Sequence, residues 1–321
     1  MMKCIGIEFP QLGEARLFDL PDPPQPGPTE IVTRTLFSGV TNGTERHTLM
    51  ADFGSRFPAR AGYQHVSVIE VVGSRVDQFT AGETVFLGNH GGHRGWHLVD
   101  LAAANERERL CIKLPPEVEH EFCALYGIAG VGFRHSRRIR VAAPMRVWVA
   151  GLGLVGQSVA QASRALGAHV TVTDVNPSRL QIAAQLGAHR VIDITDATAV
   201  ESLTQGGPYD RIVDACGAPD LFDIIYEHKL LALYGAIGAL AGRQPTVFHQ
   251  TMLHALRASI ESSSHFTLED LGMLRHFHQL GTVRLEPLVT HRVSVDEALA
   301  IYATMRDEPA ELFGVIFDWR T

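Results

Sequence analysis

Hydrophobic and polar residues alternate in short runs over the first third of the chain. Short apolar runs at residues 31–37, 66–72, 84–87 and 96–99 have the length of β-strands. Connections rich in Gly and Pro separate them, most clearly at residues 21–28. This pattern predicts a small antiparallel β-barrel or sandwich.

The pattern changes after Pro115-Pro116, where a helix is expected over residues 119–131. Apolar strands and amphipathic helices then alternate, with strands at 147–150, 170–173, 191–192, 211–214 and 231–237, and helices at 155–166 and 177–186. Strands that alternate with helices of this length predict a parallel, doubly wound sheet.

The last part of the chain returns to mixed character. Helices are expected at residues 268–280 and 295–305, with extended segments at 289–293 and 313–318. A chain of 321 residues is long enough for two domains. We therefore expect a β-rich domain over 1–119, completed by 264–321, and a nucleotide-binding domain over 120–263.

A glycine-rich turn joins the first strand of the predicted parallel sheet to its helix. The sequence GLGLVG at residues 151–156 has the spacing of a dinucleotide-binding turn. Gly151 permits the tight turn, Gly153 lets a pyrophosphate approach the backbone, and Gly156 lets helix and strand pack closely. The N–H groups at Leu154-Val155, where the helix begins, would then face the phosphates.

Asp174 ends the next strand, about 20 residues beyond Gly151, where a carboxylate can accept both ribose hydroxyls of an adenosine. The same charge would repel a 2′-phosphate, so the sequence predicts NAD rather than NADP. Arg179 follows closely and can reach the adenosine side. The alternatives are a helix N-cap for Asp174 and an ordinary surface charge for Arg179.

Two further turns follow apolar strands and belong to the carboxyl edge of such a sheet. They contain Cys216-Gly217 and Gly238. Ligands bind at that edge, so we expect these residues to line the nicotinamide. Cys216 is interpreted as a small buried filler rather than a reactive thiol.

In their order along the chain, these motifs resemble those of the medium-chain dehydrogenase/reductase superfamily. The motifs are residues 38–47 (SGVTNGTERH), 62–65 (GYQH), 71–73, 82–85, 151–156 and 173–179. The resemblance spans nearly the whole chain and implies an α/β protein with a GroES-like β-barrel catalytic domain and a Rossmann doubly wound parallel sheet. The first motif and residues 290–320 resemble zinc-free relatives of bacteriochlorophyllide dehydrogenase, whose substrate we do not carry over.

The zinc ligands of this superfamily are not matched. The zinc-dependent branch has a Cys where this chain has Thr41-Asn42, a His-Glu pair where it has Tyr63-Gln64, and a Cys or Asp near Ile128. The four-cysteine structural lobe is also missing, because only Cys111 lies in that region. Zinc requires three or four His, Cys or carboxylate ligands, so the sequence predicts no metal.

The resemblance also implies a proton relay. Thr44 and His47 keep its spacing, in which a hydroxyl touches the substrate oxygen and an imidazole passes the proton to solvent. In place of zinc, Thr44 and Tyr63 are predicted to donate hydrogen bonds to that oxygen. The alternatives are a space-filling ring for Tyr63 and a surface histidine for His47; His65 is interpreted as structural.

Two clusters have competing interpretations. His90, His93 and His97 could hold a metal, but a Gly-rich loop bordering the substrate cleft is the favoured interpretation. The basic run at residues 134–140 is interpreted as a solvated helix end, with an anion contact as the alternative.

Composition excludes several other functions. The net charge of −7 provides no basic surface for nucleic acid or anionic lipid. The sequence has neither a membrane-spanning apolar stretch nor a signal-peptide core, and its four cysteines form no CxxC pair. We therefore expect a cytoplasmic protein without a nucleic-acid or membrane partner, and the resemblance implies a homodimer.

Together these features predict a zinc-independent, NAD-dependent oxidoreductase. It would transfer a hydride between nicotinamide and a secondary alcohol or ketone, with a sugar, a polyol or a secondary-metabolite or tetrapyrrole hydroxyl as substrate. One alternative is a quinone or enoyl reductase that uses NAD(P)H. The other is a non-catalytic dinucleotide-binding sensor or structural subunit.

Overall fold

The computed structural model describes residues 3–52, 54–89, 91–242 and 246–320. The chain forms two compact units. The first comprises Met1–Gly127, Thr267–Arg275 and Leu285–Thr321, and the second comprises Ile128–Phe266 and His276–Arg284. The domain limits expected from the sequence, at 119/120 and 263/264, stay a prediction.

The second unit is built on a parallel sheet of six strands. These are β8 (Arg146–Ala150), β9 (His169–Asp174), β10 (Arg190–Asp193), β11 (Tyr209–Asp214), β12 (Leu231–Ala239) and β13 (Ser259–Ser262). Their order is β10-β9-β8-β11-β12-β13, with every pair parallel. The order reverses between β8 and β11, and ligands of such sheets bind beyond the carboxyl ends of the strands at this point.

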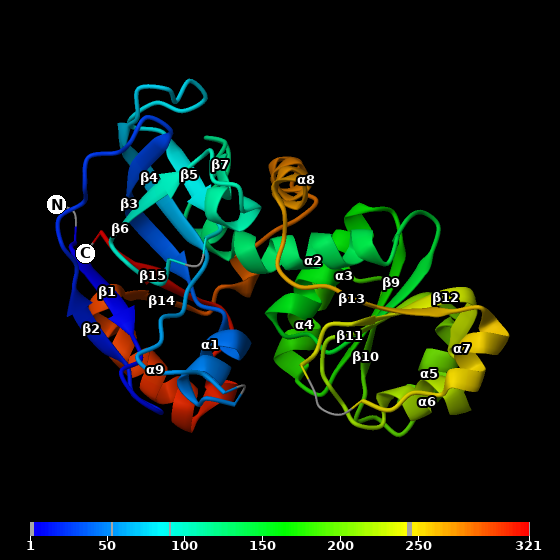
Figure 1. Cartoon of the computed structure of the whole chain (residues 1–321). Coiled ribbons are helices and arrows are strands. Elements are labelled where there is room, and N and C mark those ends of the chain that lie inside the picture. The colour runs from blue at the N-terminus through cyan, green and yellow to red at the C-terminus, as the bar shows by residue number, and fades with distance from the viewer. Residues whose placement is uncertain (1–2, 53, 90, 243–245, 321) are drawn as a thin grey trace. The chain divides into compact units, whose positions relative to one another are not determined.

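Helices cover both faces of this sheet, as Figure 1 shows. They are α2 (Tyr126–Arg138), α3 (Leu154–Ala165), α4 (Pro177–Gln185), α5 (Ala199–Gly206), α6 (Leu221–Glu227) and α7 (Gln250–Leu256). Successive residues of a strand point to opposite faces. Val147 and Val149 accordingly pack in a core with residues of α3 and α4, whereas Trp148 and Ala150 pack in a second core with α5 and α6.

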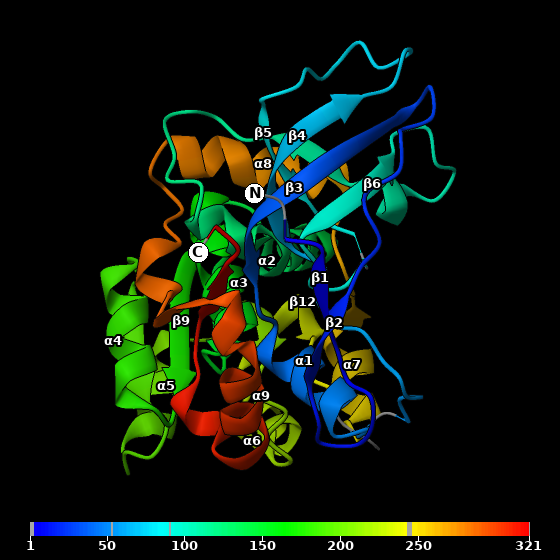
Figure 2. The same ribbon diagram turned by 90° about the vertical axis from the view of Figure 1, so that its left-hand side faces the viewer.

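The first unit contains the other strands of the described residues. They are β1 (Ile5–Glu8), β2 (Arg16–Asp19), β3 (Glu30–Gly39), β4 (His65–Val72), β5 (Thr84–Leu87), β6 (Trp96–Asp100), β7 (Cys111–Lys113), β14 (His291–Ser294) and β15 (Val315–Asp318). They pair antiparallel, except that β14 pairs in parallel with β15. The larger sheet has the order β14-β15-β3-β4-β5-β7, and β6 pairs with β3. Figure 2 shows β3 and β4 side by side along their length.

Three helices accompany these strands: α1 (Asn42–Leu49), α8 (Leu268–Gln279), which spans both units, and α9 (Ala298–Asp307). Helix α9 contributes Ile301, Tyr302 and Met305 to a core that also contains Leu49 of α1 and Phe317 of β15. The C-terminal segment therefore packs on the helix that carries the first sequence motif.

The structure confirms the predicted fold class: an α/β chain with a mixed sheet in one unit and a doubly wound parallel sheet in the other. The sequence predicts a helix over residues 119–131, but the observed helix α2 begins later, at Tyr126. Residues Phe122–Leu125 form a separate 3₁₀ turn before it. Within the described part of the chain, no helix has the length and apolar character needed to cross a membrane.

Candidate functional site

The glycine turn has the geometry that a dinucleotide requires. Gly151 follows β8 with φ of +94°, and a Cβ there would lie 2.6 Å from Cβ of Cys216. A Cβ at Gly156 would overlap the carbonyl oxygen of Gly151. At Gly153, in contrast, an added Cβ would meet no atom within 4 Å. The first and last glycines are thus required by packing, whereas the middle one leaves open space for a ligand.

Helix α3 begins at this open position. Gly153 is its N-cap and provides no side-chain hydrogen bond to the first turn. The N–H groups of Leu154 and Val155 lie in that first turn, where a helix has no internal acceptors. A phosphate would supply those acceptors and would also be favoured by the helix dipole.

Asp174 holds the turn from the end of β9. Its carboxylate accepts a hydrogen bond from the Leu152 amide at 2.6 Å and another from the Asn176 amide at 2.8 Å. The residue is only 7% exposed. A carboxylate has about four acceptor positions, so Asp174 can bond both amides and still accept from a ribose. The N-cap of α4 is Asn176 rather than Asp174.

A cavity of about 620 Å³ lies beside this turn. Gly151, Gly153, Asp174, Arg179 and Cys216 are among the residues that line it. Its walls also include apolar side chains, which would suit a nucleoside base. The cavity, the helix N-terminus and Asp174 together fit the adenosine and pyrophosphate of a dinucleotide.

The turn after β11 is organised by a residue to which the sequence assigns no role. Asp214 is 1% exposed and accepts hydrogen bonds from the amides of Cys216, at 3.3 Å, and Gly217, at 2.9 Å. Gly217 has φ of +74°, which favours glycine. Cys216 as a residue is exposed, but its sulfur is partly shielded from solvent, and this desolvation raises the pKa of the thiol. The interpretation of Cys216 as a small buried filler is therefore wrong, because the residue lies at the surface of the turn.

Gly238 on β12 is needed for a different reason than the sequence suggests. A Cβ there would overlap Nε2 of His135, which is completely buried on α2. His135 Nδ1 bonds the Ser263 hydroxyl at 2.9 Å. Interpreting residues 134–140 as a solvated helix end is therefore wrong for His135 and Ser136, both 0% exposed.

Helix α1 carries two of the predicted catalytic residues in the first unit. Thr44 is exposed, and its carbonyl accepts a hydrogen bond from the Thr48 hydroxyl at 2.9 Å. His47 lies three residues later, so the two side chains share one side of the helix. Nδ1 of His47 is 2.7 Å from Oδ2 of Asp52, and the His47 side chain is 38% exposed. Asp52 therefore orients the imidazole of His47, which is in contact with solvent.

The third predicted residue, Tyr63, is hydrogen-bonded to the Thr41 hydroxyl. The same hydroxyl is 3.3 Å from Nε2 of Gln64, which also donates to the Gly39 carbonyl. Thr41 is the N-cap of α1, yet its side chain does not cap the helix. Burial, reinforced by the charge of Glu45, raises the pKa of Tyr63 to about 12. The phenol therefore stays protonated at neutral pH and can donate a hydrogen bond.

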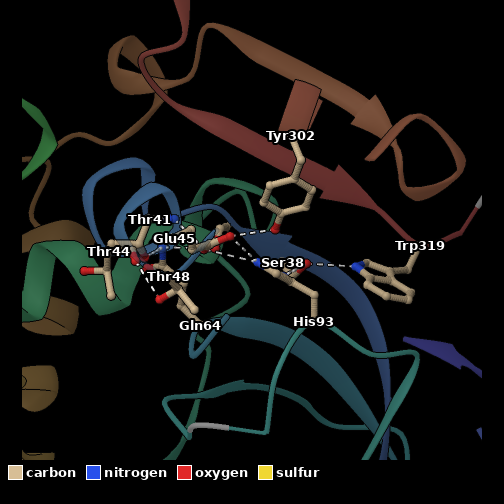
Figure 3. Close-up of polar contacts among 10 residues, drawn as sticks. Ser38, Thr41, Thr44, Glu45, Thr48, Gln64, His93, Tyr302 and Trp319 are labelled. Atoms are coloured by element: carbon tan, nitrogen blue, oxygen red, sulfur yellow. Dashed lines mark hydrogen bonds and ion pairs between the residues drawn. The ribbon is translucent and has the colours of Figure 1, made fainter. Parts of the chain in front are cut away.

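A buried polar network lies behind this group (Figure 3). Glu45 Oε1 accepts from the Thr41 amide at 2.7 Å, and Oε2 accepts from the Tyr302 hydroxyl at 2.6 Å. His93 Nε2 lies 3.2 Å from both oxygens, and the His93 and Glu45 side chains are at most 1% exposed. Figure 3 shows the side chain of Thr44 directed away from Glu45. Glu45 has no role among the predicted site residues, because an acidic residue on a short polar helix is ordinarily solvent-exposed.

The histidine loop does not match the favoured interpretation. His93 and His97 are 1% and 2% exposed, so they are core residues rather than the lining of an open cleft. His65 is also fully buried, as a structural residue would be, and its ring lies 4.2 Å from that of His97. His90 lies outside the described residues.

Comparison with known proteins agrees with this geometry. The family model described as zinc-binding dehydrogenase matches residues 155–276. Sorbitol dehydrogenase of Bos taurus is 24% identical over 329 residues, which cover 92% of this chain and 90% of the relative.

Two solved structures have the same fold. One is 2R,3R-butanediol dehydrogenase of Bacillus subtilis, with a TM-score of 0.84, 16% identity, and coverage of 98% of this chain and 99% of the other. The second is a short chain alcohol dehydrogenase of Escherichia coli complexed with NADH, with a TM-score of 0.84, 18% identity and the same coverage. These similarities agree with the resemblance of the sequence motifs to the medium-chain dehydrogenase/reductase superfamily.

Zinc, which the family description implies, does not fit the residues present. At the positions that carry zinc ligands in the zinc-dependent branch, Thr41 provides a hydroxyl, Tyr63 a phenol and Gln64 an amide. Gly127 packs beside them, because a Cβ at Gly127 would lie 2.7 Å from Oε1 of Gln64. None of these groups is a usual zinc ligand. In the described ranges, no set of three or more His, Cys, Asp or Glu side chains is arranged to hold a metal ion.

Proposed function

We propose that this protein is a zinc-independent, NAD(H)-dependent dehydrogenase that interconverts a secondary alcohol and a ketone. The observation that carries the proposal is the hydrogen-bonded group of Thr41, Tyr63 and Gln64, which provides a hydroxyl, a phenol and an amide at the position where the zinc-dependent branch has metal ligands. The relatives named sorbitol dehydrogenase and butanediol dehydrogenase support a polyol or small diol as substrate class.

The second unit would hold the cofactor. Gly151, Gly153 and Gly156 shape the turn, and the amides of Leu154-Val155 bind the pyrophosphate. Asp174 would accept from the ribose hydroxyls.

Three further positions complete this assignment. Arg179 borders the adenosine cavity, and Cys216-Gly217 and Gly238 follow or end strands at the nicotinamide end of the sheet. When bound, NAD supplies the acceptor for the hydride, and its reduced form supplies the donor.

The first unit would handle the oxygen and its proton. Negative charge develops on the substrate oxygen, and each well-placed donor is worth roughly 3 kcal/mol. Thr44 and Tyr63 are the proposed donors, so together they would recover much of what a metal provides. The alcohol proton would pass from Thr44 to His47, which reaches solvent and is fixed by Asp52.

Assembly and location are proposed on the resemblance alone. We propose a homodimer in the cytoplasm, with a small-molecule substrate and without a nucleic-acid or membrane partner. The net charge of −7 supports the absence of a nucleic-acid partner.

The test is a titration of purified, metal-analysed protein with NADH and NADPH, followed by nicotinamide fluorescence. We expect NADH to bind at least about 10-fold more tightly, because Asp174 would repel a 2′-phosphate. Turnover is then measured with sorbitol, 2,3-butanediol and the matching ketones. Preference for NADPH would favour the quinone or enoyl reductase, and tight NADH binding without turnover of any substrate would favour the sensor. Stoichiometric zinc would overturn the metal-free site.

A substitution at Asp174 tests the cofactor assignment directly. Asp174→Asn removes the charge but keeps one oxygen for the backbone amides, so discrimination against NADPH should fall about 10-fold. Asp220→Asn is the matched control, because Asp220 lines the same cavity. Equal loss of discrimination in both variants would mean that the overall charge of the cavity, and not Asp174, selects the cofactor.

A further inference from the structure

His93 connects the two sequence motifs that carry the proposed catalytic residues. Its Nδ1 lies 2.8 Å from the Ser38 hydroxyl at the end of β3, and its Nε2 bonds Glu45 on α1. Its backbone amide donates to the Ala61 carbonyl at 2.9 Å, just before the motif that contains Tyr63. One buried residue therefore bonds to Glu45, next to Thr44, through its side chain and to the segment before Tyr63 through its backbone.

The contact with the second motif is tight. Gly62 precedes Tyr63 and has φ of +103°, a conformation that favours glycine. A Cβ at Gly62 would lie 2.6 Å from Cδ2 of the His93 ring and 2.8 Å from its backbone nitrogen. The imidazole thus packs directly on the backbone that leads into Tyr63.

The contact with the first motif runs through Glu45. Burial tends to raise the pKa of Glu45, but His93 and the hydrogen bonds from Thr41 and Tyr302 outweigh it and lower the pKa. Glu45 is therefore a buried carboxylate held by three donors. It bonds the amide of Thr41, whose hydroxyl bonds Tyr63, and it directly follows Thr44 in the chain.

We propose that Glu45 and His93 form a buried positioning pair, which sets the distance between the hydroxyls of the first motif and the phenol of Tyr63. This inference rests on the proposed function. In a site built from hydroxyl donors, no metal ion draws the groups together, so their placement has to come from the protein interior. A misplacement of about 1 Å is enough to cost roughly 100-fold in rate.

Two substitutions at His93 separate positioning from packing. Glutamine can place an N–H near the position of Nε2, so His93→Gln keeps the bond to Glu45 and loses the bond to Ser38. Asparagine has a shorter side chain that matches Nδ1, so His93→Asn keeps Ser38 and leaves the Glu45 carboxylate without this donor. Each variant loses one hydrogen bond of the same buried ring, so both should lower Tm.

The two variants are compared in kcat, in KM and in hydrogen–deuterium exchange of the peptide that covers α1. We expect His93→Asn to lower kcat about 10-fold or more, with little change in KM, and to raise exchange in α1 about 10-fold. For His93→Gln, kcat and the exchange rate in α1 should each stay within about threefold of the native values. Affinity for NADH should be unchanged in each variant, because the cofactor residues belong to the second unit.

Equal kcat losses in the two variants would overturn the inference, since they would show that His93 acts only through packing. If neither variant folds, Tyr302→Phe takes their place, because it removes a different donor from the same carboxylate. A lower kcat with faster exchange in α1 would then support the positioning pair, and an unchanged kcat would overturn it.

Failure of the proposed function can be distinguished from failure of the positioning pair. If the native protein binds NADH but turns over no alcohol or ketone, the function fails and the exchange measurement still decides the inference. Faster exchange in α1 for His93→Asn but not His93→Gln would support the pair, whereas equal exchange would overturn it.

Discussion

At the scale of single residues, the hydroxyl of Tyr63 combines two properties that a metal-free site needs. Burial raises its pKa to about 12, so the group remains a donor over the whole range in which enzymes work. Its bond to Thr41 fixes its direction. A donor that is oriented before the reaction costs no reorganisation when charge develops on the substrate oxygen.

Tyr63→Phe tests this role, because it removes the hydroxyl and leaves the ring. We expect kcat to fall about 100-fold, the usual effect of losing one such donor, while the affinity for NADH is retained. Steady-state kinetics with the best alcohol and a fluorescence titration with NADH provide the two measurements. An unchanged kcat would mean that Tyr63 only fills the space.

At the scale of elements, the turn between β8 and α3 separates two uses of glycine. Gly156 is required because the helix crosses close to the carbonyl of Gly151. Gly153 has ordinary helix-cap backbone angles, with φ of −59°, and its missing side chain leaves open space at the helix N-terminus. Gly156 is thus required for the packing of the helix on the turn, whereas Gly153 leaves space for the proposed dinucleotide.

Gly153→Ala and Gly156→Ala should therefore behave differently. Gly153→Ala should leave Tm nearly unchanged and weaken NADH binding about 10-fold or more, because its methyl group occupies the space of the pyrophosphate. Gly156→Ala should destabilise the second unit by about 1–3 kcal/mol, because the added methyl overlaps backbone. Thermal unfolding and fluorescence titration measure the two effects. Full NADH affinity in Gly153→Ala would contradict this placement of the phosphates.

At the scale of the whole molecule, both units bury histidines. Burial lowers the pKa of His65 well below its usual value, that of His97 to about 3, and that of His135 to about 4. These side chains are neutral in the folded protein, and they take up protons in the unfolded chain once the pH falls below about 6.5. Below that pH the unfolded state binds more protons, so stability falls as the pH falls.

We expect each of the three histidines to cost roughly 1 kcal/mol of stability by pH 5.5, relative to pH 8. Tm should therefore drop steeply between pH 7 and pH 5, and the loss should continue toward the folded-state pKa values. His135→Asn should make the decrease shallower. A Tm that is constant from pH 7 to pH 5 would show that these rings already bind protons in the folded protein.

Residues close together in the sequence determined the cofactor half of the protein. The glycines at 151, 153 and 156 lie within a single turn, and Asp174 ends the neighbouring strand. Each requirement is local: a positive φ, a close helix crossing, a free helix N-terminus and one acid at a strand end. The alternation of apolar strands and helices is equally local, so the parallel sheet could be predicted from the sequence.

Helix α1 could not be predicted in this way, and only the tertiary structure established it. Its sequence is polar, contains Gly43 and has no apolar period, and its buried residues are Glu45 and Leu49. Contacts with distant residues stabilise this helix. The side-chain amide of Asn42 donates to the carbonyls of Leu312 and Phe313, which lie far along the chain. Helix propensity and periodicity contain no information on such contacts.

The buried pair of Glu45 and His93, with Tyr302, belongs to the same class of features. His93 and Tyr302 are 48 and 257 positions away from Glu45 along the chain. Tyr302 reaches Glu45 because the C-terminal segment packs on α1. A glutamate or a histidine is ordinarily exposed, and it becomes a structural group only where burial and a complete set of donors coincide. The sequence by itself therefore determined the glycine turn and strand-end acid on which the cofactor proposal rests, whereas the tertiary structure decided which distant residues meet around the first motif.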